Sequence, residues 1–240
     1  MFSKLALLSV VISLPLMSQT IVHTSLPPTI DGIDNEPQWQ TAKWHNFNTV
    51  IIGDKLAEED FSAQYRLLWD QNAIYIQVSI VDDVLYDNHA NPLEGYWSDD
   101  CLEIFIDEDA SGGNHQYNHN AFAYHVALDN QVVDINTSKQ PALYNDHVTS
   151  RWQRDTTSPH NITWEAAVKV FDDSFTDGKP ALPVKLHANK KVGFMLAYCD
   201  NDGSPIREHF IGSKDIIPVD SDKNLGWIDA SVFDTFTLIK

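Results

Sequence analysis

Apolar and polar residues alternate along much of the chain with a period of two, which is typical of β-strands with one buried face. The alternating segments are rich in Val, Ile, Tyr, Phe and Trp, which favour strands. The predicted strands span residues 64–69, 73–81, 101–107, 121–128, 131–136, 162–171, 191–200 and 232–239. No segment shows a helical period over three turns. A single helical turn is predicted within residues 36–44, where Pro37 suits the first helical position.

Turn-forming residues separate the predicted strands. Residues 70–72 predict one tight hairpin, and Asp129 with Asn130 predict another. Regular strands without long helices predict an all-β fold, a two-layer antiparallel β-sandwich of immunoglobulin-like or jelly-roll-like type. No linker or internal repeat divides residues 20–240, so we expect a single domain. Two long polar loops, 107–120 and 200–225, are candidates for function because long loops in compact domains often carry it.

The first nineteen residues differ from the rest of the chain. Lys4 precedes an apolar run over residues 5–17, which is too short to span a bilayer well and is followed by polar residues. Residues 1–19 are therefore predicted to be a secretory signal peptide. We expect the mature protein to be exported, to the periplasm or to the extracellular medium.

Charge and cysteine content limit the partners. The net charge is −18, which repels nucleic acids and anionic membranes but not neutral ligands or divalent cations. We expect a monomer with neither nucleic-acid nor membrane partners. The only two cysteines, Cys101 and Cys199, lie in predicted strands. An exported protein could bridge them, or both could be buried free thiols.

The segment 96–107, YWSDDCLEIFID, combines aromatic and acidic residues at the entry to a strand. Trp97 lies beside Ser98, Asp99 and Asp100. Its ring can stack on the apolar face of a sugar, and the alternative is a core tryptophan.

Glu103 is the unusual residue of this predicted strand. Leu102 and Ile104 should point to one face, and Cys101, Glu103 and Phe105 to the other. A carboxylate on a sheet face requires donors. These could be sugar hydroxyls or a basic side chain from a neighbouring strand.

Metal ligands are only weakly indicated. His115, His119 and His125 cluster in a loop that enters a strand, which does not favour a transition-metal site. The acidic residues at 107–109 could hold a structural calcium ion with loop carbonyls, although they do not match an EF-hand. Apart from this calcium we expect no cofactor.

Five segments, in order, resemble carbohydrate-binding module family 9 and its stand-alone bacterial relatives. They are residues 30–42, 65–82, 97–107, 164–170 and 193–203, and the most specific is the Trp-x-x-Asp-x-x-Glu pattern from Trp97 to Glu103. The resemblance covers nearly the whole mature chain. It implies a β-sandwich that binds sugars, often at chain ends, without catalysis, within systems that degrade polysaccharide.

The family's site is a slot between two tryptophans with a carboxylate and basic or amide side chains at its edge. Trp97 matches the first tryptophan, Glu103 the carboxylate and Arg207 a basic residue. The second tryptophan is absent from residues 207–215. The candidates to replace it are His209, Phe210 and, from the next loop, Trp227. Tyr124 or His125 stands where the family has an arginine. The predicted ligand-binding residues are Trp97, Glu103, His125, Tyr198, Arg207 and Phe210.

Two other functions compete with this interpretation. Related sandwiches hold b-type haem for electron transfer, and here Met195 and His125 could be axial ligands, although a buried methionine usually only fills a core. A glycoside hydrolase would need a carboxylate pair, which so acidic a chain cannot specify. No nucleophile-elbow or phosphate-binding motif appears. We therefore predict a non-enzymatic, exported protein that binds a mono- or oligosaccharide.

Overall fold

The computed structural model describes residues 19–240, which form fourteen strands, two short 3-10 helices and long loops. The strands are β1 (Gln19–His23), β2 (His45–Phe47), β3 (Thr49–Ile52), β4 (Phe61–Trp69), β5 (Ile74–Asp82), β6 (Cys101–Asp107), β7 (Phe122–Ala127), β8 (Val132–Ile135), β9 (Pro141–Leu143), β10 (Val148–Arg154), β11 (Ile162–Val168), β12 (Lys191–Asp200), β13 (His209–Gly212) and β14 (Asp234–Ile239). The 3-10 helices are η1 (Pro37–Thr41) and η2 (Ala230–Val232). No helix within residues 19–240 is long and apolar enough to cross a membrane.

All eight predicted strands are present. β6 and β12 have the predicted bounds, and the other six differ by at most three residues at either end. The predicted helical turn is η1. Six strands were not predicted, and five of these have only three to five residues, too few for alternation to be visible. The signal peptide predicted over residues 1–19 lies outside the described part except for Gln19, which already begins β1.

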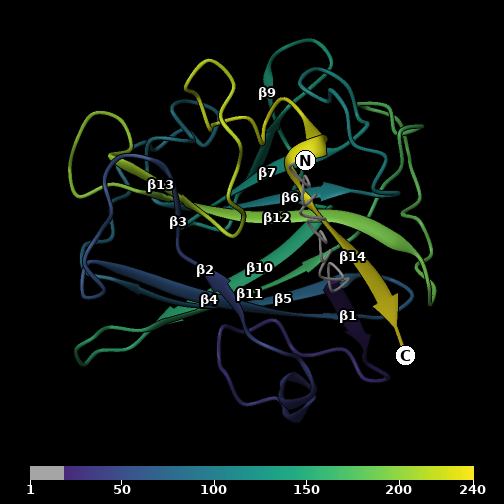
Figure 1. Cartoon of the computed structure of the whole chain (residues 1–240), viewed down its shortest axis with the longest axis horizontal. Coiled ribbons are helices and arrows are strands. Elements are labelled where there is room, and N and C mark those ends of the chain that lie inside the picture. Colours follow the sequence, from purple (N-terminus) through teal and green to yellow (C-terminus); the bar gives the residue numbers. More distant parts are fainter. Residues whose placement is uncertain (1–18) are drawn as a thin grey trace, which may run out of the picture.

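The strands form two layers (Figure 1). One layer contains β4, β5, β10 and β11, and the other contains β6, β7 and β12. β1 and β14 join the layers, because β1 pairs with both β4 and β14. These two pairings are parallel, whereas every other pairing between named strands is antiparallel. The predicted all-β sandwich is confirmed. Its pairings are antiparallel except for the two that β1 makes with β4 and β14.

The main core lies between the layers. The apolar face of β6, with Leu102, Ile104 and Ile106, packs there with Phe194 and Leu196 of β12. The opposite face of β6 carries Cys101 and Phe105, which belong to a second apolar cluster beneath the loops. The alternation predicted for β6 is therefore confirmed, and Glu103 lies on its loop-covered outer face.

The outer face of the other layer carries a closed polar network around Glu165 of β11. One carboxylate oxygen accepts from the backbone N–H groups of Asp31 and Gly32, and the other from Trp39 Nε1 and Gln77 Nε2, all at 3.0–3.1 Å. These bonds hold the segment 30–42 against the sheet. The Ile-Asp-Gly and Trp39 of the family-like opening therefore have a structural role, in the layer that does not carry Glu103.

Candidate functional site

The floor of the candidate site is the outer face of β6 and its two neighbours. Glu103 lies opposite His125 of β7 on one side and Ala197 of β12 on the other. Ala123 and Ala197 have small side chains on this face, so the sheet surface is hollow around the carboxylate. Strand alternation alone places these residues together.

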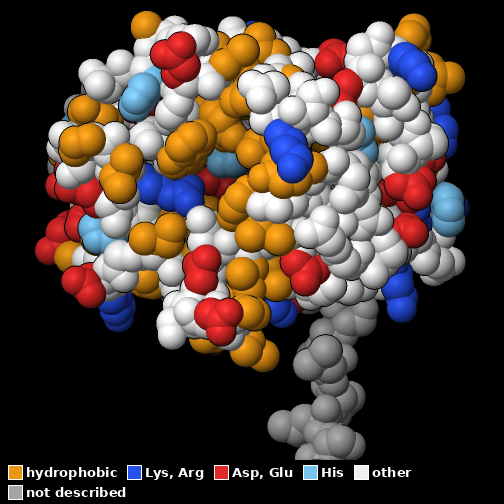
Figure 2. Space-filling view, turned by 90° about the horizontal axis from the view of Figure 1, so that it is seen from above, with side chains coloured by type: hydrophobic (Ala, Val, Ile, Leu, Met, Phe, Trp, Pro, Cys, Tyr) orange, Lys and Arg blue, Asp and Glu red, His pale blue; other side chains and the backbone are white. Residues whose placement is uncertain are grey.

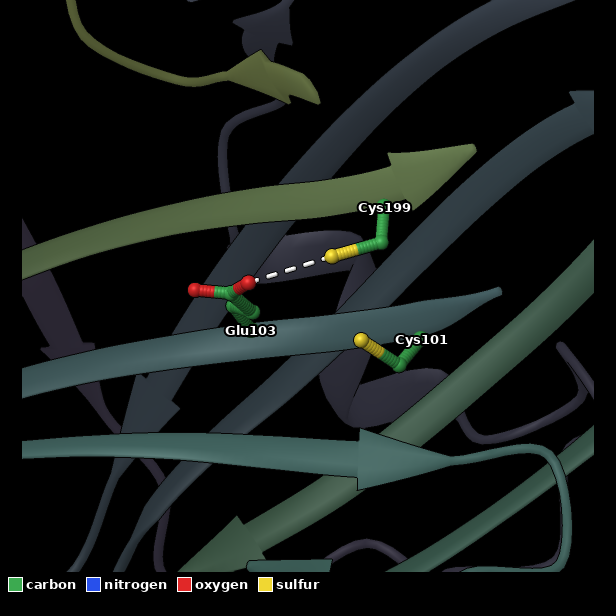
Figure 3. Close-up of side chains that lie close together, drawn as sticks. All are labelled: Cys101, Glu103 and Cys199. Atoms are coloured by element: carbon green, nitrogen blue, oxygen red, sulfur yellow. Dashed lines mark hydrogen bonds between the residues drawn. The ribbon is translucent and has the colours of Figure 1, made fainter. Parts of the chain in front are cut away.

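Glu103 is held by three side chains, all through one oxygen. Its Oε1 accepts from His125 Nε2 at 2.8 Å, from Arg207 Nη1 at 2.9 Å and from the Cys199 thiol at 3.1 Å. No donor among residues 19–240 bonds its other oxygen, Oε2, and Figure 3 shows this oxygen pointing away from Cys199. Although only 2% of Glu103 is exposed, its side chain lines a pocket. The site therefore contains an ionic acceptor with one oxygen available.

Charge fixes the protonation state of this acceptor. Burial alone would raise the pKa of Glu103, but the charge and hydrogen bond of His125, together with Arg207, lower it to about 2. Glu103 is thus a carboxylate at any physiological pH. Arg207 also lies over the Phe210 ring, with its Cζ 4.0 Å from the ring centroid, a cation–π contact that fixes the guanidinium.

Aromatic side chains from the loop before β6 form one wall. Tyr96 packs edge-on against both Trp97 and His125, with ring centroids 4.8 and 4.7 Å apart. Trp97 is 44% exposed, the only tryptophan among the large exposed apolar side chains of residues 19–240. A tryptophan that is supported from behind and open in front is suited to stacking on a ligand ring.

The acids after Trp97 hold this loop in place and do not line the pocket. Asp99 accepts from the backbone N–H of His89 at 2.7 Å and contacts its Nδ1 at 2.9 Å. Asp100 accepts from the N–H groups of Tyr86 and Asn201. Gly95, at φ +57°, lies so close to His89 that a Cβ would be 2.7 Å from Nε2 of that ring. The Trp-x-x-Asp-x-x-Glu pattern therefore combines three roles: Trp97 is an exposed aromatic side chain, Asp100 anchors its loop, and Glu103 is a hydrogen-bond acceptor.

Trp227 reaches the pocket from the long loop before η2. The adjacent Gly226 packs directly on the sheet, since a Cβ there would be 2.6 Å from Met195 Cε and 3.0 Å from Phe105. His115 donates from Nε2 to the Gly226 carbonyl at 2.7 Å, which ties loop 107–120 to this loop. The glycine and the histidine together place Trp227 on the pocket wall.

The complete pocket has a volume of about 290 Å³, near the lower end for small-molecule sites. Figure 2 shows hydrophobic side chains gathered around a hollow that contains basic, acidic and histidine atoms. Asp134 of β8 also lines it, with both oxygens accepting backbone N–H groups, from Ala123 and Ile135. Burial raises the pKa of Asp134 to about 7, against the lowering effect of those two bonds.

The structure brings four of the six predicted residues together: Trp97, Glu103, His125 and Arg207 all line the pocket. Phe210 does not line it but supports Arg207 from below. Tyr198 was wrongly assigned to the site. It lies opposite Leu102, faces the core between the layers, and donates its hydroxyl to Asp82 at 2.7 Å.

The second aromatic wall is Trp227, one of the three replacements considered for the missing tryptophan. His209 lies instead beside Asp200, 3.2 Å from its carboxylate. Sequence reasoning did not find Tyr96 or Asp134 as lining residues. For Tyr96 the adjacent Trp97 was an available signal, whereas Asp134 reaches the site only through the pairing of β8 with β7.

The residues of the competing interpretations are placed differently. Met195 is fully buried in the apolar cluster under the loops and does not line the pocket with His125, so the two proposed haem ligands do not face one cavity. At the predicted calcium loop, Asp107 accepts from the N–H groups of Asp109 and Gly112, and Glu108 pairs with Lys190. Calcium binding stays a prediction.

The comparisons with known proteins identify the family. The profile of the family "Carbohydrate family 9 binding domain-like" matches residues 30–240, and the chain belongs to this family. Endo-1,4-beta-xylanase A of Thermotoga maritima is 36% identical over 81 residues, which are 34% of this chain and 7% of that enzyme. Endo-1,4-beta-xylanase C of Paenibacillus barcinonensis is 29% identical over 105 residues, 44% of this chain and 9% of that enzyme. The chain thus matches a small part of each xylanase.

Solved structures confirm the fold. A family 9 carbohydrate-binding module from Caldicellulosiruptor kristjanssonii in complex with cellotriose has a TM-score of 0.65 and 22% identity, over 92% of this chain and 93% of that one. A family 9 carbohydrate-binding module from the same organism, in complex with glucose, gives a TM-score of 0.64 over 92% and 95% of the two chains. The sandwich that the sequence resemblance implied is the sandwich of these modules.

Proposed function

We propose that this protein binds a neutral mono- or oligosaccharide in the pocket between Trp97 and Trp227, without catalysing its breakdown. The observation that carries the proposal is the free Oε2 of Glu103 at the base of a pocket with aromatic walls. A sugar ring has an apolar face and polar edges, and this pocket offers an apolar wall and a charged acceptor. The cellotriose and glucose complexes of the related module support the same ligand class.

Each part of the pocket has a role in this binding. The exposed face of Trp97 stacks on the ring, and Tyr96 keeps the indole from collapsing onto the sheet. Glu103 accepts from a sugar hydroxyl, and the Arg207 guanidinium with the His125 contact on its other oxygen keeps it ionised. The carboxylate is already desolvated and oriented in the free protein. A sugar hydroxyl can therefore bond it with little of the free energy that dehydrating an acceptor usually costs.

The state of the pocket carboxylates supports binding without catalysis. A Glu103 with a pKa of about 2 cannot donate a proton to a leaving group near neutral pH. Asp134 uses both oxygens for backbone N–H groups, which fixes it as part of the pocket wall. Most glycosidases use one carboxylic acid and one carboxylate that flank the scissile bond, and the fixed position of Asp134 on the wall argues against that role here.

The test is calorimetric titration of glucose, cellotriose and a xylo-oligosaccharide into the wild type and into Trp97→Ala. We expect the variant to bind at least about 30-fold more weakly, which corresponds to about 2 kcal/mol for a central aromatic contact. Trp44→Ala is the matched control. Trp44 contacts Arg66 on the other layer, so its loss should leave sugar affinity unchanged.

Three results would contradict the proposal. Equal binding by wild type and Trp97→Ala would move the site elsewhere. Release of reducing sugar by highly purified protein, lost in Glu103→Gln, would make the protein a hydrolase. No binding of any of the three sugars by the wild type would exclude this class of neutral sugar as the ligand.

The biological setting is also a proposal. The predicted signal peptide supports export to the periplasm or the medium, and the partial similarity to two xylanases supports a role beside polysaccharide-degrading enzymes. A monomer is expected to suffice, because the whole pocket is built by one chain.

A further inference from the structure

The two cysteines lie directly opposite each other under the pocket. Cys101 of β6 and Cys199 of β12 are partners in the antiparallel register, both are fully buried, and both are free thiols. Their sulfur atoms and a Glu103 oxygen all lie within 4.8 Å of one another. Figure 3 shows the three side chains grouped on one face of the two strands. The chain contains no other cysteine.

The pair has the geometry for a disulfide. Residues directly opposite in an antiparallel pair have Cα atoms roughly 4.5–5.5 Å apart, inside the range of about 4.4–6.8 Å that disulfides require. The two sulfurs already lie within 4.8 Å of each other, and rotation about the Cα–Cβ bonds can bring them closer. The bond would link positions 101 and 199, closing a loop of about 100 residues, the kind that is expected to stabilise most.

A metal ion is a poorer occupant of the same cluster. Arg207 Nη1 lies 2.9 Å from Cys199 Sγ and 2.9 Å from Glu103 Oε1, so a guanidinium nitrogen already occupies the position between these two ligands. Burial and the neighbouring Cys199 raise the pKa of Cys101, which keeps it a neutral thiol. Both observations favour a thiol pair over a coordinated cation.

The sulfur of Cys199 is also part of the sugar site. Its S–H donates to Glu103 Oε1, and the same sulfur accepts from Arg207. A disulfide has no S–H, and its formation draws the Cys199 sulfur towards Cys101. Oxidation would therefore remove one donor from Glu103 and one acceptor from Arg207 at once.

We propose that Cys101 and Cys199 form a reversible cross-strand disulfide, and that its formation weakens sugar binding by loosening the Glu103–Arg207 pair. The second part rests on the proposed sugar site. A small-molecule disulfide is the oxidant. One cysteine thiolate attacks it, forming a mixed disulfide and releasing one small thiol. The other cysteine then displaces the second small thiol, so two electrons and two protons pass to the oxidant. Because both sulfurs are buried, the exchange proceeds during folding or local opening.

The experiment refolds the full chain with oxidised or with reduced glutathione and counts alkylated cysteines by mass spectrometry. We expect no alkylated cysteine and no bound glutathione in the oxidised sample, and two alkylated cysteines in the reduced one, with a higher denaturant midpoint for the oxidised form. Glucose and cellotriose are then titrated into both. The oxidised form should bind roughly 3- to 10-fold more weakly, the effect of about one hydrogen bond, and reduction should restore affinity.

Cys101→Ser is the control variant. It keeps the Cys199 thiol against Glu103 but cannot form the disulfide. Oxidised glutathione can only add to its Cys199 as a mixed disulfide, which the mass measurement detects, and the protein without this adduct should match reduced wild type in affinity. Two alkylated cysteines after oxidative refolding would overturn the disulfide. A complete disulfide with unchanged affinity would overturn its coupling to the site. If neither form binds sugar, the proposed function and the coupling fail together, while the mass measurement still decides the disulfide separately.

Discussion

Two buried glutamates, one on each layer, show what distinguishes a binding site from scaffold in this protein. Glu103 and Glu165 both lie on outer strand faces, and both are almost completely inaccessible. Glu165 accepts four protein hydrogen bonds, two on each oxygen. Glu103 receives three donors on one oxygen, and no donor among residues 19–240 bonds the other.

The comparison teaches that burial of a carboxylate does not by itself indicate function. A saturated carboxylate such as Glu165 ties chain segments together and has no capacity for a ligand. A partly satisfied one is costly to bury unless something completes its bonding. At Glu103 the contacts with His125 and Arg207 offset the desolvation of the carboxylate, and a sugar hydroxyl can provide the missing hydrogen bond to Oε2.

The largest expected effect is on stability, from Glu165→Ala. This change leaves two backbone N–H groups, the Trp39 indole and the Gln77 amide without their acceptor, and should lower the free energy of unfolding by about 3–5 kcal/mol. Urea titration measures it. The exposed Glu58→Ala is the control and should change little. A loss below about 1 kcal/mol would mean that the network is not what holds segment 30–42.

Glu103→Gln should change sugar affinity more than stability, the opposite of what is expected for Glu165→Ala. The amide keeps an oxygen for His125 and Arg207 but loses the charged acceptor that faces the ligand. We expect sugar affinity to fall about 10- to 100-fold, the effect of a hydrogen bond to a charged group, with a smaller change in the urea midpoint. Glu165→Gln, assayed well below its melting temperature, should bind sugar as the wild type does. Unchanged affinity in Glu103→Gln would break the distinction between the two glutamates.

A third type of buried carboxyl group has a raised pKa and should make the stability of the protein depend on pH. Burial raises the pKa of Asp82 to about 7, and burial and the neighbouring Asp82 raise that of Asp200 to about 8. Such groups are protonated when folded but ionised when unfolded between about pH 4 and 7–8, so stability should fall as pH rises through that window. Asp82→Asn should remove part of the fall, on the order of 2 kcal/mol between pH 5 and 8.

The measurement is the urea midpoint at several pH values, with the exposed Asp54→Asn as control. An identical pH slope in wild type and Asp82→Asn would contradict the assignment. Glu103 contributes with the opposite sign, because its pKa is depressed. Its contribution is present above about pH 4.5 and is lost only as pH falls towards 2.

The smallest expected effect concerns calcium at loop 107–109. Asp107 and Asp109 already bond backbone N–H groups, so an ion adds little, and a chelator should lower the melting temperature by only about 1–3 °C. Added calcium should restore it in the wild type but not in Asp109→Asn. Identical melting curves with and without chelator would remove the calcium prediction.

The sequence predicts much of this site because β6 and β12 have clear alternation. That alternation alone places Glu103 on the face away from the core, and the family resemblance adds Trp97 and Arg207. The prediction that Tyr198 binds the ligand was wrong by one position, because neighbouring residues of a strand point to opposite faces of the sheet. Asp99 and Asp100 were interpreted as a polar setting for Trp97, but they are buried anchors of its loop.

The sequence named Trp227 as one of three candidates for the second wall but could not choose among them. Trp227 reaches the pocket only because Gly226 packs on Met195 and because His115, more than one hundred residues earlier, bonds the Gly226 carbonyl. Such contacts between loops depend on packing that no local pattern records. The same holds for Asp134, which depends on the register of β8.

The most direct test is a crystal structure of the protein with glucose bound. A sugar ring against Trp97, with a hydroxyl within hydrogen-bond distance of Glu103 Oε2, is the predicted result. Glucose bound outside this pocket, or bound in it with Glu103 Oε2 left without a ligand hydroxyl, would contradict the account.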